Sequence, residues 1–328
     1  EAELVAPRDA GRRMDDDGVA DGIAFGMQRF LDDERAVVHA AGEHEERGAG
    51  GVDDGRFGGA DEFRVGIEYA CGAEVLDDTA RPCRPDQPCV PGERLYYYRR
   101  IEDEQPIPFV EELLFQDDHL LVVDKPHFLP VVPTGRYVQQ SLLVRLKRRT
   151  GIDTLSPLHR IDRETAGVVV FSIRPQDRDA YQALFRQRQI DKLYQAIAPA
   201  APEGFLLQGH VRRSRIEEDP TGFFRMREVP GEANSETRIT ELERQGGWAR
   251  LALEPVTGKR HQLRVHMAAL GLPLVGDQFY PKVRRGPDEP EDFADPLRLL
   301  AQAIAFTDPL TGQPRRFESR RALEWPAG

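Results

Sequence analysis

The sequence predicts an α+β domain with a mixed, largely antiparallel β-sheet and flanking helices. Apolar or alternating runs at 168–171, 236–242, 248–253 and 299–306 are typical of strands. Two of these runs are separated by a Gly-Gly pair at 246, which indicates an antiparallel hairpin. Helical patterns lie between the strands, so we expect helices to cover a sheet that organises the fold.

Length and composition indicate a soluble globular protein. A chain of 328 residues can bury a substantial core, and its 40% hydrophobic and 31% charged residues fit this class. No run reaches the length of a membrane span and no basic-then-apolar leader opens the chain, so we expect a cytoplasmic protein without membrane contact. Cys71, Cys83 and Cys89 form no Cys-x-x-Cys pair, which favours free thiols.

The charge is unevenly distributed. The net charge is −11, but residues 1–62 hold 17 acidic and 7 basic residues, so they alone carry −10. Residues 125–282 hold 25 basic and 17 acidic residues, or +8. The excess of positive charge therefore coincides with the motifs described below and favours a nucleic-acid partner.

The first hundred residues carry little periodicity. Gly, Asp, Glu and Arg dominate residues 1–62, which predicts disorder, or else a non-native extension such as out-of-frame translation of GC-rich DNA would produce. Residues 91–99 are typical of a turn followed by a strand. From there onward the sequence has the pattern of a folded domain.

The first strand and helix of that domain end in positive charge. Residues 115–126 predict a turn, an apolar strand and a Lys-Pro exit, where Lys125 is either a solvated charge or a contact to a carboxylate or phosphate. Ser141 is positioned to cap a helix over 142–149. The basic end of this helix either complements the helix dipole or contacts an RNA backbone.

The central stretch, residues 159–167, reads His-Arg-Ile-Asp-Arg-Glu-Thr-Ala-Gly and leads into the buried strand at 168–171. Asp162 is thereby held at the edge of a core, between Arg160 and Arg163. Guanidinium groups nearby favour its anion, whereas burial opposes it. An Asp that forms a salt bridge to Arg163 in a turn is the structural alternative to a catalytic one.

Three further segments follow. Pro175 begins a helix that reaches Phe185, and residues 192–197 form a short strand in which Tyr194, judged alone, would be a core aromatic. Residues 203–233 predict surface strands and loops, and 284–297 predict a loop. The last motif, residues 255–277, precedes a closing strand and hairpin.

Two histidines of the last motif resemble metal ligands at first sight. His261 and His266 are five residues apart, which on a helix separates them by about 140°. Zinc sites on one helix prefer a spacing of four residues. We therefore expect no metal, and we expect His159 and His261 to hold loops by hydrogen bonding.

Four segments in this order resemble the motifs of RluA-type pseudouridine synthases. The strand that ends in Lys-Pro at 125–126, with Pro-Thr-Gly at 133–135, is similar to the first motif. Residues 159–167 resemble the signature His-Arg-Leu-Asp-x-x-Thr-Ser-Gly, with Ile161 and Ala166 as conservative departures. Residues 192–196 resemble Lys-x-Tyr-x-Ala, and 255–277 resemble the last motif almost continuously.

The resemblance implies a synthase-like catalytic domain with a central cleft over residues 101–328. Residues 63–100 are then expected to be the remnant of an S4-like RNA-binding segment, with a plain β-hairpin as the alternative. The implied activity converts uridine to pseudouridine in structured RNA, in ribosomal RNA ahead of transfer RNA. Because this isomerisation has no net redox change, phosphate transfer or water consumption, we expect no cofactor, and we expect a monomer.

The resemblance also assigns roles to residues. Asp162 would attack the base or the ribose, or remove the 2′ proton, and Arg264 would pair with it in a bidentate contact. Tyr194 would stack on the flipped base and help transfer the C5 proton. The expected substrate-binding residues are Arg160, which would fill the vacated stack, Leu263 as apolar floor, Lys125 and His159.

Two rival functions are compatible with parts of the sequence. A non-catalytic RNA-binding protein would share the basic region but would not require Asp162. A metal-dependent nuclease would use Asp153, Asp162 and Asp277 as ligands and would be inhibited by EDTA.

Overall fold

The computed structural model describes residues 35–39, 75–76, 81, 94–98, 104–135, 137–220, 222, 224–286, 289 and 292–326. The chain divides into two compact units, Glu1–Arg100 and Ile101–Gly328. Most of the first unit, with the three cysteines, lies outside the described residues, and so do most of the segments expected to be a disordered extension and an S4-like remnant. Within it, strands β1 (Arg35–His39), β3 (Arg94–Tyr98) and β2 (Val75–Leu76) pair antiparallel in that order.

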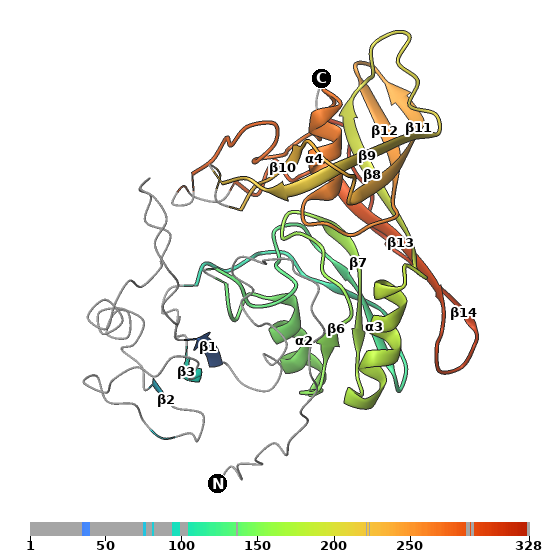
Figure 1. Ribbon diagram of the computed structural model, residues 1–328. Coiled ribbons are helices and arrows are strands. Elements are labelled where there is room, and N and C mark those ends of the chain that lie inside the picture. The colour runs from blue at the N-terminus through green and yellow to red at the C-terminus, as the bar shows by residue number, and fades with distance from the viewer. Residues whose placement is uncertain are drawn as a thin grey trace. The chain divides into compact units, whose positions relative to one another are not determined.

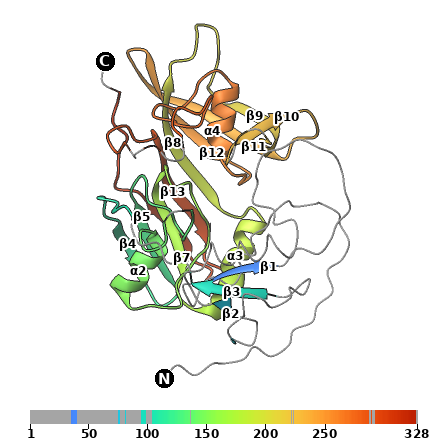
Figure 2. The ribbon, with the colours of Figure 1, turned by 90° about the vertical axis from the view of Figure 1, so that its left-hand side faces the viewer.

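The second unit is built on one 11-stranded sheet (Figures 1 and 2). Its central path has the order β10-β9-β11-β12-β8-β13-β7-β5-β4, while β14 pairs with β13 and β6 pairs with β7. Only the pairing of β13 with β7 is parallel among the described strands, so the predicted α+β fold with a mixed, largely antiparallel sheet is confirmed. The strands are β4 (Glu112–Gln116), β5 (Leu120–Lys125), β6 (Ser156–Pro157), β7 (Ala166–Ser172), β8 (Asp191–Pro199), β9 (His210–Glu218), β10 (Met226–Val229), β11 (Ser235–Gln245), β12 (Trp248–Pro255), β13 (Leu299–Thr307) and β14 (Pro314–Glu318).

The helices are short. They are α2 (Leu142–Thr150), a 3-10 turn (Pro175–Asp177) that continues into α3 (Arg178–Arg186), and α4 (Gln262–Ala269). The first two helices lie at predicted positions, whereas α4 was not predicted. None of the helices in the described ranges is long and apolar enough to span a bilayer.

The predicted cap of α2 is wrong in one respect. Ser141 does occupy the N-cap position, but its hydroxyl donates to the carbonyl of Val138, 2.9 Å away, instead of accepting from the first turn of the helix. On the same helix, Arg145 donates to the carbonyls of Ile107 and Phe109. The positive charge of this residue is thus used to hold the segment before β4.

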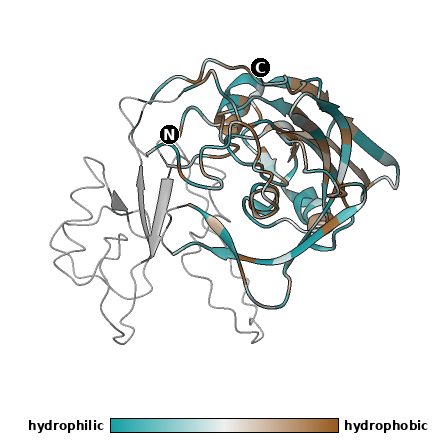
Figure 3. Ribbon diagram, turned by 90° about the horizontal axis from the view of Figure 1, so that it is seen from above, coloured by the Kyte–Doolittle hydropathy of each residue, from teal (hydrophilic) through white to brown (hydrophobic). Residues whose placement is uncertain are grey.

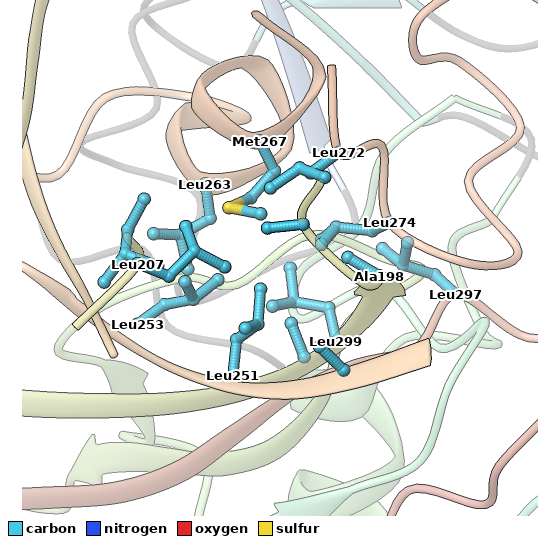
Figure 4. Packing of buried hydrophobic residues seen from close by; sticks show 14 residues of the cluster. Ala198, Leu207, Leu251, Leu253, Leu263, Met267, Leu272, Leu274, Leu297 and Leu299 are labelled. Carbon is cyan, nitrogen blue, oxygen red and sulfur yellow. The ribbon is translucent and has the colours of Figure 1, made fainter. Parts of the chain in front are cut away.

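Two apolar clusters lie at opposite ends of the sheet. The first lies between α4 and the strands β8, β11, β12 and β13; Figure 4 shows Leu263 and Met267 of α4 pointing toward the leucines of the strands. The second joins β5, β7 and α3, and it includes Ile304 and Phe306 of β13. Because β13 also gives Leu299 to the first cluster, this one strand links both cores.

Apolar and polar stretches follow one another along the ribbon of the second unit, as the brown and teal colours in Figure 3 show, and in some strands the buried and exposed residues alternate. In β11, for example, Ser235, Thr237 and Ile239 are buried, whereas the residues between them are more exposed. β11 and β12 form the predicted antiparallel pair and turn at Gly246. The alternation that predicted this pair is therefore the alternation of the buried and exposed faces.

The parallel pairing of β13 with β7 requires a glycine. Gly167 lies opposite Ala301 and has φ +114°, and a Cβ built on it would lie 2.2 Å from the carbonyl oxygen of Ala301. Only glycine allows this backbone conformation and this approach. The loop before β7, which contains Asp162, is thereby fixed relative to β13.

Candidate active site

Asp162 lies in the loop between β6 and β7, and its side chain is 22% exposed. Nη1 of Arg264, on α4, donates to Oδ2 of Asp162 over 3.2 Å. The two residues are 102 positions apart in the sequence, so the fold brings them together. No hydrogen bond among the described residues reaches Oδ1 of Asp162, which leaves this oxygen available for chemistry.

The expected bidentate pair between Arg264 and Asp162 is wrong. The fork of Arg264 is occupied by Asp277, whose carboxylate accepts from Nε over 2.9 Å and from Nη2 over 2.7 Å. Asp277 is itself fixed, since it also accepts from the backbone amides of Phe279 and Tyr280. Only Nη1 remains for Asp162, so this contact is single.

Glu164 is a second neighbour of the same nitrogen that sequence reasoning missed. Its Oε2 lies 3.5 Å from Nη1 of Arg264, and its Oε1 accepts from Nε of Arg163 over 3.1 Å. Burial alone would raise the pKa of this carboxyl, but Arg163 and Arg264 lower it to about 2. Glu164 is therefore an anion throughout the neutral range.

Arg264 is enclosed on all sides. Its side chain has no exposed surface, and its guanidinium lies 5.1 Å from the ring centre of Phe279 and 5.4 Å from that of Tyr280. Burial would lower the pKa of Arg264, but the carboxylates, Asp277 first, raise it. Carboxylates and aromatic rings thus keep a buried cation charged.

Tyr194 extends from β8 toward this cluster. Burial, together with the negative charge of Asp162, raises the pKa of its phenol above the usual value. The ring is half-buried and packs against the first apolar cluster, to which Leu263 belongs. Asp162, Arg264, Tyr194 and Leu263 therefore gather in one region, as expected.

Lys125 does not lie where the sequence suggested. It is fully buried at the end of β5, and its Nζ donates to the carbonyls of Pro126, Leu129 and Arg163 over 3.0, 2.7 and 3.1 Å. Both expectations, a solvated charge and a substrate contact, are wrong, because the amino group is buried and donates its hydrogen bonds to backbone carbonyls. Lys125 supports the Asp162 loop from behind.

His127 gives the same loop a second support. Its Nδ1 donates to the carbonyl of Glu164 over 2.6 Å, and burial lowers the pKa of the ring to about 4. Together with Lys125, it holds two successive carbonyls of the loop. No motif identified it, because a single His after a strand carries no specific pattern.

His159 and Arg160, the other expected substrate-binding residues, differ in position. Nε2 of His159 accepts from the amide of Val170 over 3.2 Å, and its ring stacks on Phe185 at 5.2 Å. Burial lowers the pKa of His159 to about 3. His159 thus holds the loop before β7 by a hydrogen bond, as expected, and Arg160 is exposed. Substrate binding by these two residues stays a prediction.

The histidines of the last motif are used structurally. His261 hydrogen-bonds the hydroxyl of Tyr280 over 2.9 Å, and His266 contacts Thr237 over 2.9 Å. Within the described ranges, no three His, Cys, Asp or Glu side chains are grouped so as to hold a metal ion. The ligand set proposed for a nuclease is therefore not assembled.

A small pocket adjoins the group of charged side chains around Arg264. Asp162 is not among its lining residues, which come from the turn after β5, from the Asp162 loop and from the segments that follow α4. They are Phe128, Arg163, Glu164, Gly276, Gln278, Phe279, Arg285, Asp295 and Leu297.

Comparison with known proteins links this geometry to one family. The model of the RNA pseudouridylate synthase family matches residues 119–269. The dual-specificity RNA pseudouridine synthase RluA of Haemophilus influenzae is 33% identical over 225 residues, which are 67% of this chain and 97% of that protein. RluA of Escherichia coli (strain K12) is 32% identical over 63% of this chain and 91% of its own length.

Solved structures agree at the level of the fold. Human RNA pseudouridylate synthase domain containing 1 superimposes with a TM-score of 0.52 at 20% identity, over 65% of this chain and 84% of that one. Asp162, Tyr194, Leu263 and Arg264 all lie within residues 119–269, the part of the chain that the family model matches.

Proposed function

The chain belongs to the RNA pseudouridine synthase family, and we propose that Asp162, without a cofactor, isomerises specific uridines in structured RNA, ribosomal RNA ahead of transfer RNA. We propose residues 101–328 as the catalytic domain of a cytoplasmic monomer. The observation that carries the proposal is the contact of 3.2 Å between Asp162 and the fully buried Arg264. A buried guanidinium that donates to the carboxylate holds it in a fixed orientation.

Three routes are compatible with this arrangement. The Asp162 carboxylate gives an electron pair to the base, to C1′ of the ribose or to the 2′ proton. In each route the bond from C1′ to N1 breaks, its electron pair leaves with uracil, and a bond from C1′ to C5 replaces it. The proton on C5 is then lost, N1 takes up a proton in its place, and Asp162 returns to its starting charge.

Access to the uridine requires that it leave its stack, which costs a few kcal/mol. Arg160 is exposed next to the Asp162 loop, where a planar guanidinium can occupy the vacated space. Tyr194 lies close enough to Asp162 for the carboxylate charge to raise the pKa of its phenol, which stays protonated, and it can stack on the flipped base. These roles are consistent with where the two side chains lie.

The test replaces Asp162. Asp162→Asn should abolish pseudouridine formation in ribosomal and transfer RNA transcripts, measured by release of tritium from C5-labelled uridine. Asp153→Asn, which changes an exposed Asp in a neighbouring turn, is the matched control and should retain activity.

The two rival functions give different results in the same assay. A nuclease would release no tritium and would instead cut the RNA in a reaction that EDTA abolishes, whereas tritium release by the synthase should persist in EDTA. A non-catalytic RNA-binding protein would release no tritium even as the unmodified chain.

A further inference from the structure

We propose that Glu164 is a positioning residue that shares Arg264 with Asp162 and so keeps the Asp162 carboxylate reactive. The inference rests on the proposed function, because it concerns the same carboxylate. Glu164 occupies one of the two positions that the signature His-Arg-Leu-Asp-x-x-Thr-Ser-Gly leaves unspecified.

The geometry shows the sharing. Nη1 of Arg264 lies 3.2 Å from Asp162 and 3.5 Å from Glu164, so one NH2 group of the guanidinium faces two anions. The other donors of that guanidinium that face carboxylates bind Asp277. Arg264 therefore cannot give Asp162 a full, exclusive ion pair while Glu164 is charged.

Sharing has a chemical advantage. A carboxylate held by an exclusive buried guanidinium is stabilised as the anion, and it is correspondingly weak as a base or nucleophile. Glu164 offsets part of this stabilisation, because its negative charge lies beside the same nitrogen. Asp162 is then still oriented by Arg264, and it is a stronger base than it would be without the charge of Glu164.

The advantage extends through the reaction. When Asp162 gives its electron pair to carbon or to a proton, its negative charge is lost, and Arg264 would have one fewer anion near a fully buried cation. Glu164 remains charged at this stage, since its pKa of about 2 lies far below neutral. Arg264 thus keeps two carboxylate partners, Asp277 and Glu164.

Other titratable groups also face these two carboxylates, and none of these residues is changed in the variants proposed below. Around Asp162 they are Lys125, Tyr194, His261 and Arg264; around Glu164 they are Lys125, Arg163, His261 and Arg264.

The test is Glu164→Gln, which removes the charge and keeps the shape. We expect the single-turnover rate of pseudouridine formation at neutral pH to fall about tenfold, with KM within about twofold. The acidic limb of its pH profile should move to lower pH by up to about one unit, because Asp162 becomes a weaker base. A residue that only supported folding would lower the rate without moving this limb.

Two further variants complete the design. Glu164→Asp keeps the charge and should restore the position of the acidic limb and most of the rate. Glu111→Gln is the matched control, since Glu111 is also a buried carboxylate near two arginines, Arg145 and Arg149, but lies outside the site; its profile should match the unmodified protein.

Three outcomes would overturn the inference: an unchanged profile for Glu164→Gln, a limb that moves to higher pH, or identical profiles for the Gln and Asp variants. If Glu164→Gln does not fold, Glu164→Asp alone decides, because a limb that moves despite the retained charge rejects the proposal. Failure of the proposed function is distinguishable, since then the unmodified protein would form no pseudouridine or Asp162→Asn would remain active.

Discussion

Arg264 is the residue on which the site depends most. It has no exposed surface, and its charge is balanced by Asp277, Asp162 and Glu164. Removing one partner of a buried ion pair typically costs 3–5 kcal/mol, because the remaining charge stays buried. Asp277 accepts from Nε and Nη2 of Arg264 and therefore fixes the direction of Nη1, which donates to Asp162.

Asp277→Asn tests this at the level of the single residue. We expect the free energy of unfolding to fall by about 3 kcal/mol, measured in urea, and the rate of pseudouridine formation to fall by at least tenfold. The control is Asp308→Asn, which removes another buried carboxylate, one bound to Arg315 away from the site. This variant should lose stability but keep its rate; equal rate losses in both variants would contradict the role given to Asp277.

The sequence could predict the residues whose chemistry is tied to a motif. Asp162, Arg264 and Tyr194 were predicted from motifs, and the fold brings them together. No role was predicted for Glu164, because the signature does not specify the residue type at its position. Lys125 was misjudged because a strand pattern shows that a residue ends a strand but not that backbone carbonyls enclose its ammonium group.

At the level of the elements, β7 and β13 determine where the Asp162 loop lies. Their parallel pairing brings Gly167 against Ala301, and Tyr194 of β8 pairs with Ala301 from the other side. The sequence predicted these strands and one hairpin, but not this pairing. Alternation identifies the buried face of a strand and carries no information on which strand lies beside it.

Gly167→Ala should therefore be severely destabilising. The added Cβ would meet backbone atoms at 2.2 Å, and the residue would be held at φ +114°. We expect a loss of about 3 kcal/mol or more in the free energy of unfolding, measured in urea. Gly247→Ala is the control, because its Cβ would meet nothing within 4 Å; a similar loss there would show that the tight approach is not the cause.

At the level of the whole second unit, β13 couples the two ends of the sheet. Ile304 belongs to the cluster of β5, β7 and α3, whereas Trp248 and Trp325 pack at the cluster of Ile197 and Leu300. A continuous sheet with a shared strand should unfold as one cooperative unit. The sequence predicted one catalytic domain over 101–328, but it could not show that a single strand serves both cores.

Ile304→Ala provides the test. We expect the variant to lose about 3 kcal/mol in the free energy of unfolding, as is typical when a buried Ile is replaced by Ala. The urea midpoint should fall equally when it is followed by tryptophan fluorescence and by far-UV circular dichroism. Val110→Ala, at an exposed position, should change neither midpoint. A fluorescence midpoint that stays constant while the dichroism midpoint falls would mean that the two ends unfold independently.

The position of β13 has a consequence for how the protein is made. On the ribosome, β8 ends at Pro199 and β13 begins at Leu299, so the 99 residues 200–298 must be synthesised before the strand that separates β7 from β8 begins to appear. Until then, β7 and β8 each expose an unpaired edge in the nascent chain. Tyr194 and the Asp162 loop can take their final places only after this late insertion, so the emerging polypeptide remains inactive during most of its translation.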